Sequence, residues 1–445
     1  MRRSPARIPA EGAGHAHSAK THAGTLAGGD VSERLPGSDR NPGGSVDRGG
    51  YVTAPRRDHQ PRLGRFRHAA LTLGALGTVA SIAAGCSTPT LAADPAPEPE
   101  PPGPTAVLGS PAAHPVRHAV DDPATWPNRA LAAQLVMAPA AMGDPRPATT
   151  WARMGLGGIL ISGAVPADLG VRLARLRSAA SVPPLVASNE EGGSVQRLQG
   201  LIYPLPSAGS MGRVLTPDRI RRGATEYGKR MKALHVDVAL APDADLAIPG
   251  HYIASDARAF SADPGAAGRD AAALATGLLR AGVLPVVKHW PGHGQASNTH
   301  TGAARVPPLN VLERRDLRAF ETAFEAGAPA VMVGHLTVPG LTETGLPASL
   351  SPAAYRYLRA QAGPDTLVLT DSMSMGASTA AVGLDTATAC VRALQAGADM
   401  VVFNTGDPIP VVSAIAAAID AGTYPRAAAV AAAGRILAAK RLVGD

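Results

Sequence analysis

The chain has 445 residues, enough for one large or two ordinary domains, and its 45% hydrophobic content is ample for a packed core. The formal net charge of +7 arises near the start, because residues 1–85 hold 12 Lys and Arg against 6 Asp and Glu, and the remainder holds 30 against 29. This distribution gives no support to a nucleic-acid-binding domain. The two cysteines, Cys86 and Cys390, are too few for a disulfide framework or a cysteine-rich metal site.

The first 86 residues carry the signals of export. Residues 1–55 are rich in Gly, Arg, His and Pro without periodicity, which predicts disorder or a start codon assigned too early. Residues 56–86 resemble a signal peptide, since a basic segment precedes an uncharged apolar run (69–85) that is short for a spanning helix. The ending "AAGC" resembles the bacterial lipobox, which implies lipidation of Cys86. An uncleaved anchor, or an ordinary signal with an incidental cysteine, is the alternative.

A Pro- and Ala-rich segment, residues 87–118, follows and predicts a semi-rigid tether. Together these segments predict an exported protein anchored by lipid to the outer face of the cell membrane. Residues 119–445 are expected to form the folded domain.

That domain alternates continuous apolar runs with Ala-rich helical segments. Continuous rather than alternating runs indicate strands buried on both faces, as in a parallel sheet with crossover helices. Seven or eight such units predict an α/β protein with a single (β/α)8 TIM-type barrel, with a doubly wound open sheet as the alternative. The expected strands are 157–163, 183–188, 236–242, 283–289, 329–335, 366–371 and 398–404.

Polar side chains follow these runs where each one ends. In a barrel, such strand ends open onto one catalytic mouth, so their repetition predicts an active site there. Asp371, in "LVLTDSMSMGA", either projects into that pocket or caps a helix. The strand-end residues are Asn189, Glu190, Asp243, Asp245, Lys288, His289, His335 and Asp371.

The stretch "KHWPGHGQASNTHTG", residues 288–302, holds three histidines and a proline and glycines that forbid regular structure. We expect a flexible loop that carries His293 and His300 away from the strand. Three histidines could ligate zinc, but the stretch contains no Asp or Glu and no HExxH, so no metal is expected. General acid/base catalysis suits a loop histidine better.

This stretch resembles the KHFPGHG…DSH signature of family 3 glycoside hydrolases, in their β-N-acetylglucosaminidase branch. Further resemblances follow in the family's order across nearly all of residues 119–445. "NEEGGSVQRL" (189–198) is similar to DxEGGxVxRL, "LAPDADL" (240–246) to APVxDV, "ASDARAF" (254–260) to IGxRSF, and "TDSMSMGA" (370–377) to TDDLSMGA, while "AGADMVVFN" (396–404) fits the seventh strand.

The resemblance implies an exo-acting enzyme, without a cofactor, that removes terminal β-linked N-acetylglucosamine (GlcNAc) from peptidoglycan fragments or other saccharides. It implies a retaining mechanism with Asp371 as the nucleophile and His300 as the acid/base. It assigns His293 to holding the loop together. It also implies hydroxyl binding by Lys288, His289, Arg258 and Arg197, and at the position of Asn189.

Several departures from the family's pattern bear on activity. Asn298 stands where the family has the Asp partner of the loop histidine, and the loop is one residue shorter. Asn189 stands where the family has a sugar-binding Asp, with Glu190 beside it as a candidate to compensate for the lost charge. Ser194 replaces a common Arg.

These departures keep other functions open. A non-catalytic sugar-binding lipoprotein on the same barrel is favoured by Asn189 and Asn298, while the retained Asp371 opposes it. A phosphorolytic variant is a further alternative, because an acid/base without a nearby carboxylate repels phosphate less. A related hydrolase with another sugar specificity is the third.

Overall fold

The computed structural model describes residues 122–444. The predictions for residues 1–55, 56–86 and 87–118, including lipidation of Cys86, lie outside the described residues. Cys390 is buried in a helix with a free thiol, as expected of a small core residue, and burial raises the pKa of that thiol.

The described domain is built around a parallel sheet of nine strands that closes on itself. The strand order is β7-β6-β3-β2-β1-β13-β12-β10-β8. The two outermost strands, β7 and β8, are consecutive in the chain and separated by Val286 alone, so the sheet returns to one interrupted strand. Counting that strand once leaves eight, and the predicted TIM-type barrel is confirmed. The bounds are β1 Val136–Ala141, β2 Gly158–Ser162, β3 Leu185–Ser188, β6 Val238–Ala239, β7 Leu284–Pro285, β8 Val287–Trp290, β10 Ala330–Val333, β12 Leu367–Ser372 and β13 Met400–Val402.

Each of the seven predicted strand segments contains part of this sheet, and one strand was missed. β1 has the sequence VMAPAA, whose small residues and internal Pro139 carry a weak strand signal. It lies between β2 and β13, with Met137–Ala141 in parallel register with β2. Tertiary context therefore decides this strand, because both its faces are covered. Short pairs flank the barrel: β4 Glu190–Gly192 with β5 Val195–Gln196, and β9 Ala304–Arg305 with β11 Leu336–Thr337.

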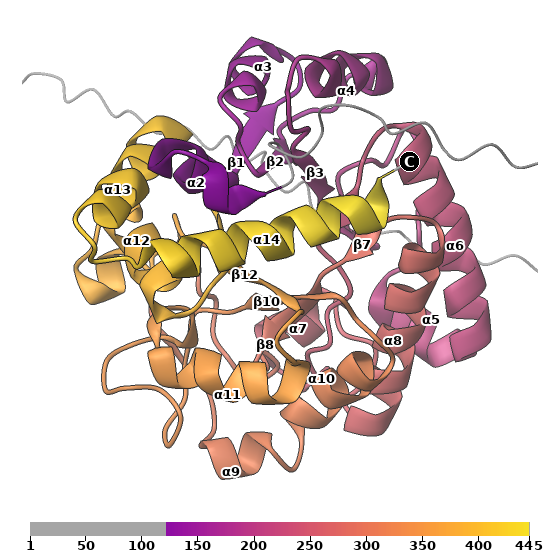
Figure 1. The fold of residues 1–445 in the computed structure, drawn as a ribbon. Helices are drawn as coiled ribbons and strands as arrows, with labels where there is room; N and C mark the ends of the chain where they lie inside the picture. The colour runs from indigo at the N-terminus through magenta and orange to yellow at the C-terminus, as the bar shows by residue number, and fades with distance from the viewer. Residues whose placement is uncertain (1–121, 445) are drawn as a thin grey trace, which may run out of the picture. The chain divides into compact units, whose positions relative to one another are not determined.

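Helices surround the barrel, with α6 and α8 side by side and α12 and α13 at another side (Figure 1). Small residues allow close packing: a Cβ at Gly277 of α8 would lie 2.4 Å from the Arg221 carbonyl oxygen of α6. The helices are α2 Asn128–Gln134, α3 Arg146–Arg153, α4 Leu169–Ser178, α5 Ala208–Val214, α6 Pro217–Ala233, α7 Tyr252–Ser255, α8 Pro264–Arg280, α9 Leu309–Leu312, α10 Asp316–Glu325, α11 Pro352–Ala362, α12 Thr386–Ala396, α13 Pro408–Asp420 and α14 Arg426–Val443; 3-10 turns are η1 Pro123–Thr125, η2 Ala348–Leu350 and η3 Ala380–Val382.

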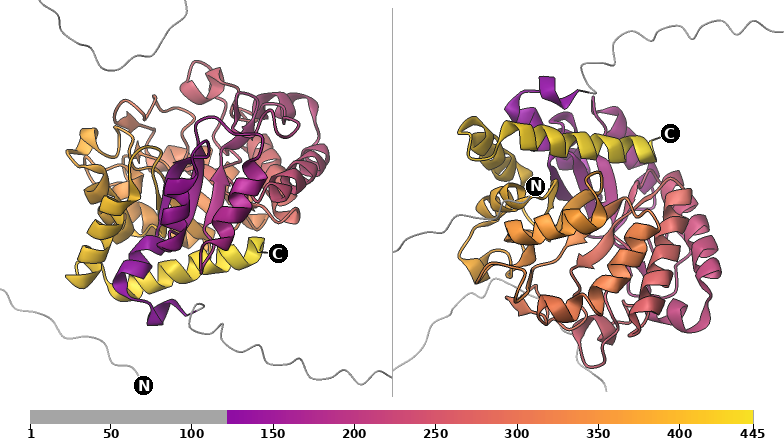
Figure 2. Two further views of the ribbon diagram at one scale, coloured as in Figure 1. Left: turned by 90° about the horizontal axis from the view of Figure 1, so that it is seen from above. Right: turned by 60° about the horizontal axis from the view of Figure 1, so that its bottom comes forward.

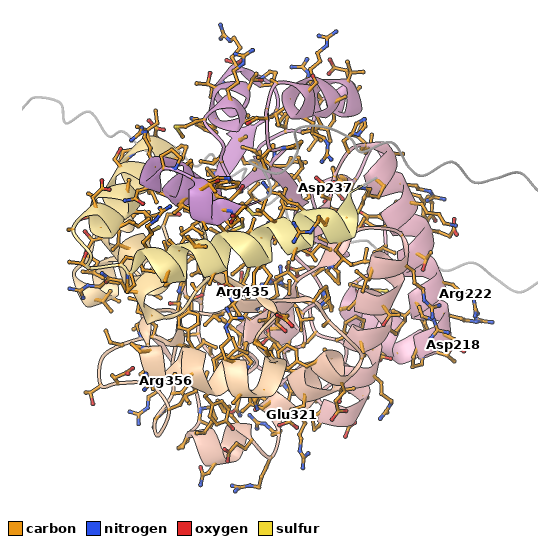
Figure 3. All side chains as sticks on the ribbon, viewed as in Figure 1. Asp218, Arg222, Asp237, Glu321, Arg356 and Arg435 are labelled. Carbon is orange, nitrogen blue, oxygen red and sulfur yellow. The ribbon has the colours of Figure 1, made fainter. Side chains whose placement is uncertain are left out.

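The last helix, α14, lies across the amino ends of the strands (Figure 2). Asp399, which directly precedes β13, accepts hydrogen bonds from Arg359 of α11 at 2.6 Å and from Arg435 of α14 at 2.8 Å. Asp237, before β6, pairs with Arg177 at 2.6 Å. Figure 3 shows Asp237 and Arg435 along α14. Buried carboxylates therefore fasten the outer helices to this end, leaving the opposite end for the site.

Asp399→Ala is expected to lower the free energy of unfolding by about 3–5 kcal/mol, because it leaves two guanidinium groups without their partner. Chemical denaturation measures this difference. The control is Asp365→Ala, an exposed Asp in the turn before β12, expected to change stability by less than about 0.5 kcal/mol. Equal effects of both substitutions would contradict the role given to Asp399.

Candidate active site

A cavity of about 230 Å³ opens at the carboxyl ends of the strands. Parallel strands point the residues that follow them toward the same mouth, so segments far apart in sequence converge there. Six of the residues expected at the site line this cavity: Asn189, Arg258, Lys288, His289, His300 and Asp371.

Asp371 is the fifth residue of β12 and is half-buried in the cavity wall. Its Oδ1 accepts a hydrogen bond from the backbone N–H of Ser372 at 2.7 Å. Turns follow the strand, and the next helical element is the 3-10 turn Ala380–Val382, so the alternative role as a helix cap is wrong. Burial alone would raise the pKa of Asp371, but His289, His335, the backbone N–H of Ser372 and Lys288 together outweigh burial and lower the pKa to about 2. The carboxylate is therefore ionised at neutral pH and available as a nucleophile.

His335 fixes the backbone beside Asp371. Its Nε2–H donates to the carbonyl oxygen of Ser372 at 2.9 Å, and the Ser349 hydroxyl donates to Nδ1 at 2.7 Å. Burial lowers the pKa of His335, which keeps the ring neutral in this arrangement. A strand-end histidine that sequence alone left without a role thus holds the end of β12.

His289 faces the cavity with its Nδ1 bound to Asp245. The Nδ1–Oδ2 distance is 2.7 Å, and the backbone N–H of His293 donates to the other Asp245 oxygen at 2.6 Å. Burial lowers the pKa of His289, but the carboxylates of Asp245, Asp243 and Asp371 together outweigh burial and raise the pKa overall. These contacts favour the charged form of His289, whose Nε2–H remains for a ligand.

Lys288 and Arg258 are held by two buried carboxylates, those of Glu191 and Asp243. These four residues are called the four-residue network. Glu191 lies 2.5 Å from the Lys288 Nζ and receives two hydrogen bonds from the Arg258 guanidinium, at 2.7 and 3.0 Å. Asp243 lies 3.3 Å from Arg258 Nη2 and 3.8 Å from Lys288 Nζ. Burial would raise the pKa of Glu191, but the two cations lower it to about 2. For Asp243 burial prevails over Arg258, and its pKa is raised to about 7.

His300 reaches the cavity on the loop that follows β8. Its Nδ1–H donates to Oδ1 of Asn298 at 2.8 Å, and its backbone N–H donates to the same oxygen at 3.0 Å. Backbone N–H groups of Gly376 and Ala377 donate to the carbonyls of His300 and Thr299, at 3.2 and 3.3 Å, so the loop rests on the segment after Asp371. Asn298 thus sets the ring's tautomer without supplying a negative charge.

His293 stays within the loop. Its Nε2 lies 3.3 Å from the Thr299 hydroxyl, and the side chain is buried. Burial lowers its pKa to about 4, so the ring is neutral. These contacts fit the expected role of holding the loop together, although its edge also lines the cavity.

The positions of Arg197 and Glu190 differ from those expected from the sequence. Arg197 is exposed, its guanidinium lies 3.5 Å from the carbonyl of Gly163, and it is outside the residues that line the cavity. Glu190 cannot supply the charge missing at Asn189, so that suggestion is wrong. Its carboxylate is committed to Ser188 at 2.5 Å, to the Tyr227 hydroxyl and to two backbone N–H groups of residues 197 and 198.

Sequence reasoning missed Glu191, Tyr252 and Asn404 as lining residues. Glu191 corresponds to the Glu of the DxEGG motif, so the motif itself held the signal. Tyr252 belongs to the four-residue helix α7, with its ring centroid 5.9 Å from the Arg258 Cζ. Asn404 follows β13 and accepts a hydrogen bond from Ser374 at 2.6 Å.

Three possible metal ligands, Asp243, Asp245 and His289, lie with their ligand atoms within 4.8 Å of one another. Each carboxylate already contacts a cationic side chain: Asp245 contacts His289 at 2.7 Å and Asp243 contacts Arg258 at 3.3 Å. The arrangement is one of internal ion pairs, and we assign no metal ion to it.

The fold and the cavity are those of a barrel glycosidase. The profile described as the glycosyl hydrolase family 3 N terminal domain matches residues 145–439, and the chain belongs to this family. The predicted family is thereby confirmed.

Relatives narrow the comparison. "Beta-hexosaminidase LpqI" of Mycobacterium tuberculosis is 38% identical over 286 residues, covering 61% of this chain and 72% of that protein. A family 3 glycosyl hydrolase structure from Mycobacterium smegmatis has 38% identity and a TM-score of 0.67, covering 72% of this chain and 98% of that one. A β-N-acetylglucosaminidase structure from Paenibacillus sp. has 28% identity and a TM-score of 0.66, covering 71% and 62%.

The charge of His289 should set the acid limit of activity. We expect His289→Gln to move the acid limb of kcat/KM upward by about one pH unit or more, because the pKa of Asp371 rises when the charge that lowers it most is lost. If Asp371 is the nucleophile, as the family resemblance implies, it must be ionised to attack, so activity is then lost at a higher pH as the pH falls. The control is His235→Gln, just beyond α6 at the opposite end of the barrel. An acid limb unchanged in His289→Gln would contradict this account.

Proposed function

We propose that this chain is a retaining, exo-acting β-N-acetylglucosaminidase that removes terminal β-linked GlcNAc from peptidoglycan fragments. The observation that carries the proposal is that Asp371 and His300 line one cavity together with Lys288, His289 and Arg258. Relatives named as β-hexosaminidases and a β-N-acetylglucosaminidase support the choice of sugar.

The chemistry follows from the two groups in two steps. Asp371 attacks the anomeric carbon while the bond from that carbon to the leaving oxygen breaks, and His300 gives its Nε2 proton to that oxygen. This step leaves a glycosyl ester of Asp371 as a covalent intermediate. A water molecule then attacks the same carbon, His300 takes its proton, and the Asp371 carboxylate is released.

Substrate binding falls to the charged donors around the cavity. Lys288, His289 and Arg258 are held in place by buried carboxylates, so they offer hydrogen-bond donors with little loss of side-chain entropy on binding. Donors placed in this way can hold a non-reducing sugar with its anomeric carbon over Asp371. The natural aglycone would extend out of the cavity mouth.

We place the enzyme outside the cell, bound to the membrane by a lipid on Cys86. The support is the basic, apolar and AAGC pattern of residues 56–86. Among the described residues, none of the helices combines the length and apolar character that crossing a bilayer requires. Globomycin-sensitive processing and a mass consistent with lipidated Cys86 are the expected observations.

Asp371→Asn should lower turnover of a chromogenic β-N-acetylglucosaminide on the order of 10³-fold or more, because an amide cannot form the glycosyl ester. Digestion of the quenched wild type and mass analysis of its peptides should show one added GlcNAc unit on the peptide that contains Asp371. Asp365→Asn is the control and keeps wild-type activity. Comparable activity in Asp371→Asn would remove the nucleophile. Sugar binding without wild-type turnover would instead favour the sugar-binding lipoprotein.

A second candidate is phosphorolysis at the same site, favoured by the neutral partner of His300. Asn298 accepts the Nδ1–H at 2.8 Å without bringing a carboxylate to the place where an acceptor must arrive. Phosphate would then attack the glycosyl ester in place of water, releasing Asp371 and forming GlcNAc-1-phosphate. Assays with and without inorganic phosphate, followed by product identification, separate the two reactions.

Asn298→Asp should raise hydrolysis on the order of tenfold or more and move the basic limb of its pH profile upward. An aspartate stabilises the charged imidazole that donates the proton, and losing such a carboxylate costs a serine-protease triad about 10⁴ in rate. Any phosphate-dependent turnover should fall in the same variant, because the new charge repels phosphate. Asn310→Asp, an exposed site on α9, is the matched control. An unaltered rate and pH profile would contradict the claim that the neutral Asn298 limits His300 as an acid/base.

A further inference from the structure

Asp243 is a buried carboxylate that the proposed mechanism leaves unused. It follows β6 closely and forms a parallel bridge with Lys288 where the barrel closes between β6 and β8. The backbone on either side is tied across this seam, since the Lys288 N–H donates to the Pro242 carbonyl at 3.0 Å and the Ala244 N–H donates to the Lys288 carbonyl at 2.7 Å. Asp243 is 1% exposed and does not line the cavity, so it can act only through its neighbours.

Those neighbours are the two cations that face the cavity. Asp243 Oδ2 lies 3.3 Å from Arg258 Nη2, and Oδ1 lies 3.8 Å from Lys288 Nζ. Neither Asp243 oxygen has a hydrogen-bond partner of good geometry, so its contacts are chiefly ionic. Glu191 holds the same two cations from the cavity side. The four-residue network therefore contains two positive and two negative groups when Asp243 is ionised.

Two residues near Lys288, Asn189 and Asp243, differ from the motifs that the rest of the chain resembles. Asn189 stands where the motif DxEGG has an aspartate, and Asp243 stands where the motif APVxDV has a valine. The Asn189 Oδ1 lies 3.4 Å from Lys288 Nζ, so the two positions share one cation. Compared with the motifs, this chain therefore lacks the carboxylate at residue 189, on the cavity side of Lys288. It has an additional carboxylate at residue 243, on the other side of Lys288.

We propose that Asp243 is a positioning residue that replaces, from behind Lys288 and Arg258, the negative charge absent at Asn189. Two buried cations beside Glu191 alone would carry an uncompensated charge, which is costly in a desolvated site. With Asp243 present the cations keep their places, and the cavity wall offers the ligand an uncharged amide at residue 189. The effect on catalysis rests on the proposed function, whereas the effect on stability does not.

The charge replacement predicts that the two positions compensate each other. Asp243→Asn should lower the melting temperature of the full chain without ligand and raise KM about tenfold or more, with a smaller change in kcat. Adding Asn189→Asp should restore both quantities, because it returns the carboxylate to the other side of Lys288. Asn189→Asp alone should restore nothing and should lower the melting temperature, because three carboxylates then face two cations. Measurements at about pH 8 keep Asp243 ionised, since that is above its pKa of about 7.

Asp237→Asn is the matched control. Asp237 is also 1% exposed and precedes the same strand, β6, but it pairs with Arg177 and Lys232 at the opposite end of the barrel. It should lower the melting temperature, leave KM unchanged, and gain nothing from Asn189→Asp. Rescue of Asp243→Asn but not of Asp237→Asn separates charge replacement from a general effect on folding.

The outcomes distinguish this inference from the proposed activity. If Asp243→Asn fails to accumulate as folded protein, its recovery on adding Asn189→Asp is the expected result, and failure of both is the contrary one. Additive effects of the two substitutions on melting temperature would overturn the charge replacement, whatever the enzyme's activity. Lack of wild-type turnover combined with rescued stability would overturn the proposed function and leave the role of Asp243 supported.

Discussion

The site depends on the pairing of two buried cations with two buried carboxylates where the barrel closes. Lys288 and Arg258 would be poorly stabilised in a desolvated wall, but Glu191, together with Asp243 when it is ionised, balances their charge and fixes their direction. Asp243 and Lys288 also form a backbone bridge between the segment after β6 and β8, so the same two residues join neighbouring parts of the barrel and pair their side chains at 3.8 Å. The pairing of barrel segments and the arrangement of charges beside the cavity are therefore linked at Asp243 and Lys288.

The same electrostatic logic sets the states of the reacting groups. Asp245, with Asp243 and Asp371, raises the pKa of His289, and His289 is the first of several groups that together lower the pKa of Asp371 despite burial. The proposed acid/base, His300, lies outside this buried set: its own side chain is exposed, and its hydrogen-bond partner Asn298 is a neutral amide. The proposed nucleophile thus lies at the end of a barrel strand, while the proposed proton donor lies on the loop that follows β8.

Much of the barrel could be predicted because its signals are local. Continuous apolar runs identified seven strand segments, and polar residues at their ends identified the mouth. β1 could not be found in this way, because VMAPAA is made a strand by its neighbours rather than by its own propensity. The partners of Glu190 and Glu191 could not be predicted either. Adjacent residues on a short strand point to opposite sides, and only packing decides which side faces the cavity.

By itself the sequence determined the family and the barrel class, and it singled out the loop histidine and the strand-end carboxylate as candidates, since each depends on a short motif or on local periodicity. Tertiary structure alone decided which charges meet. Asp243, Glu191, Arg258 and Lys288 lie on four separate segments, and their distances exist only once the sheet has closed. Charge interactions depend on separation in space and on burial, neither of which the order of residues contains.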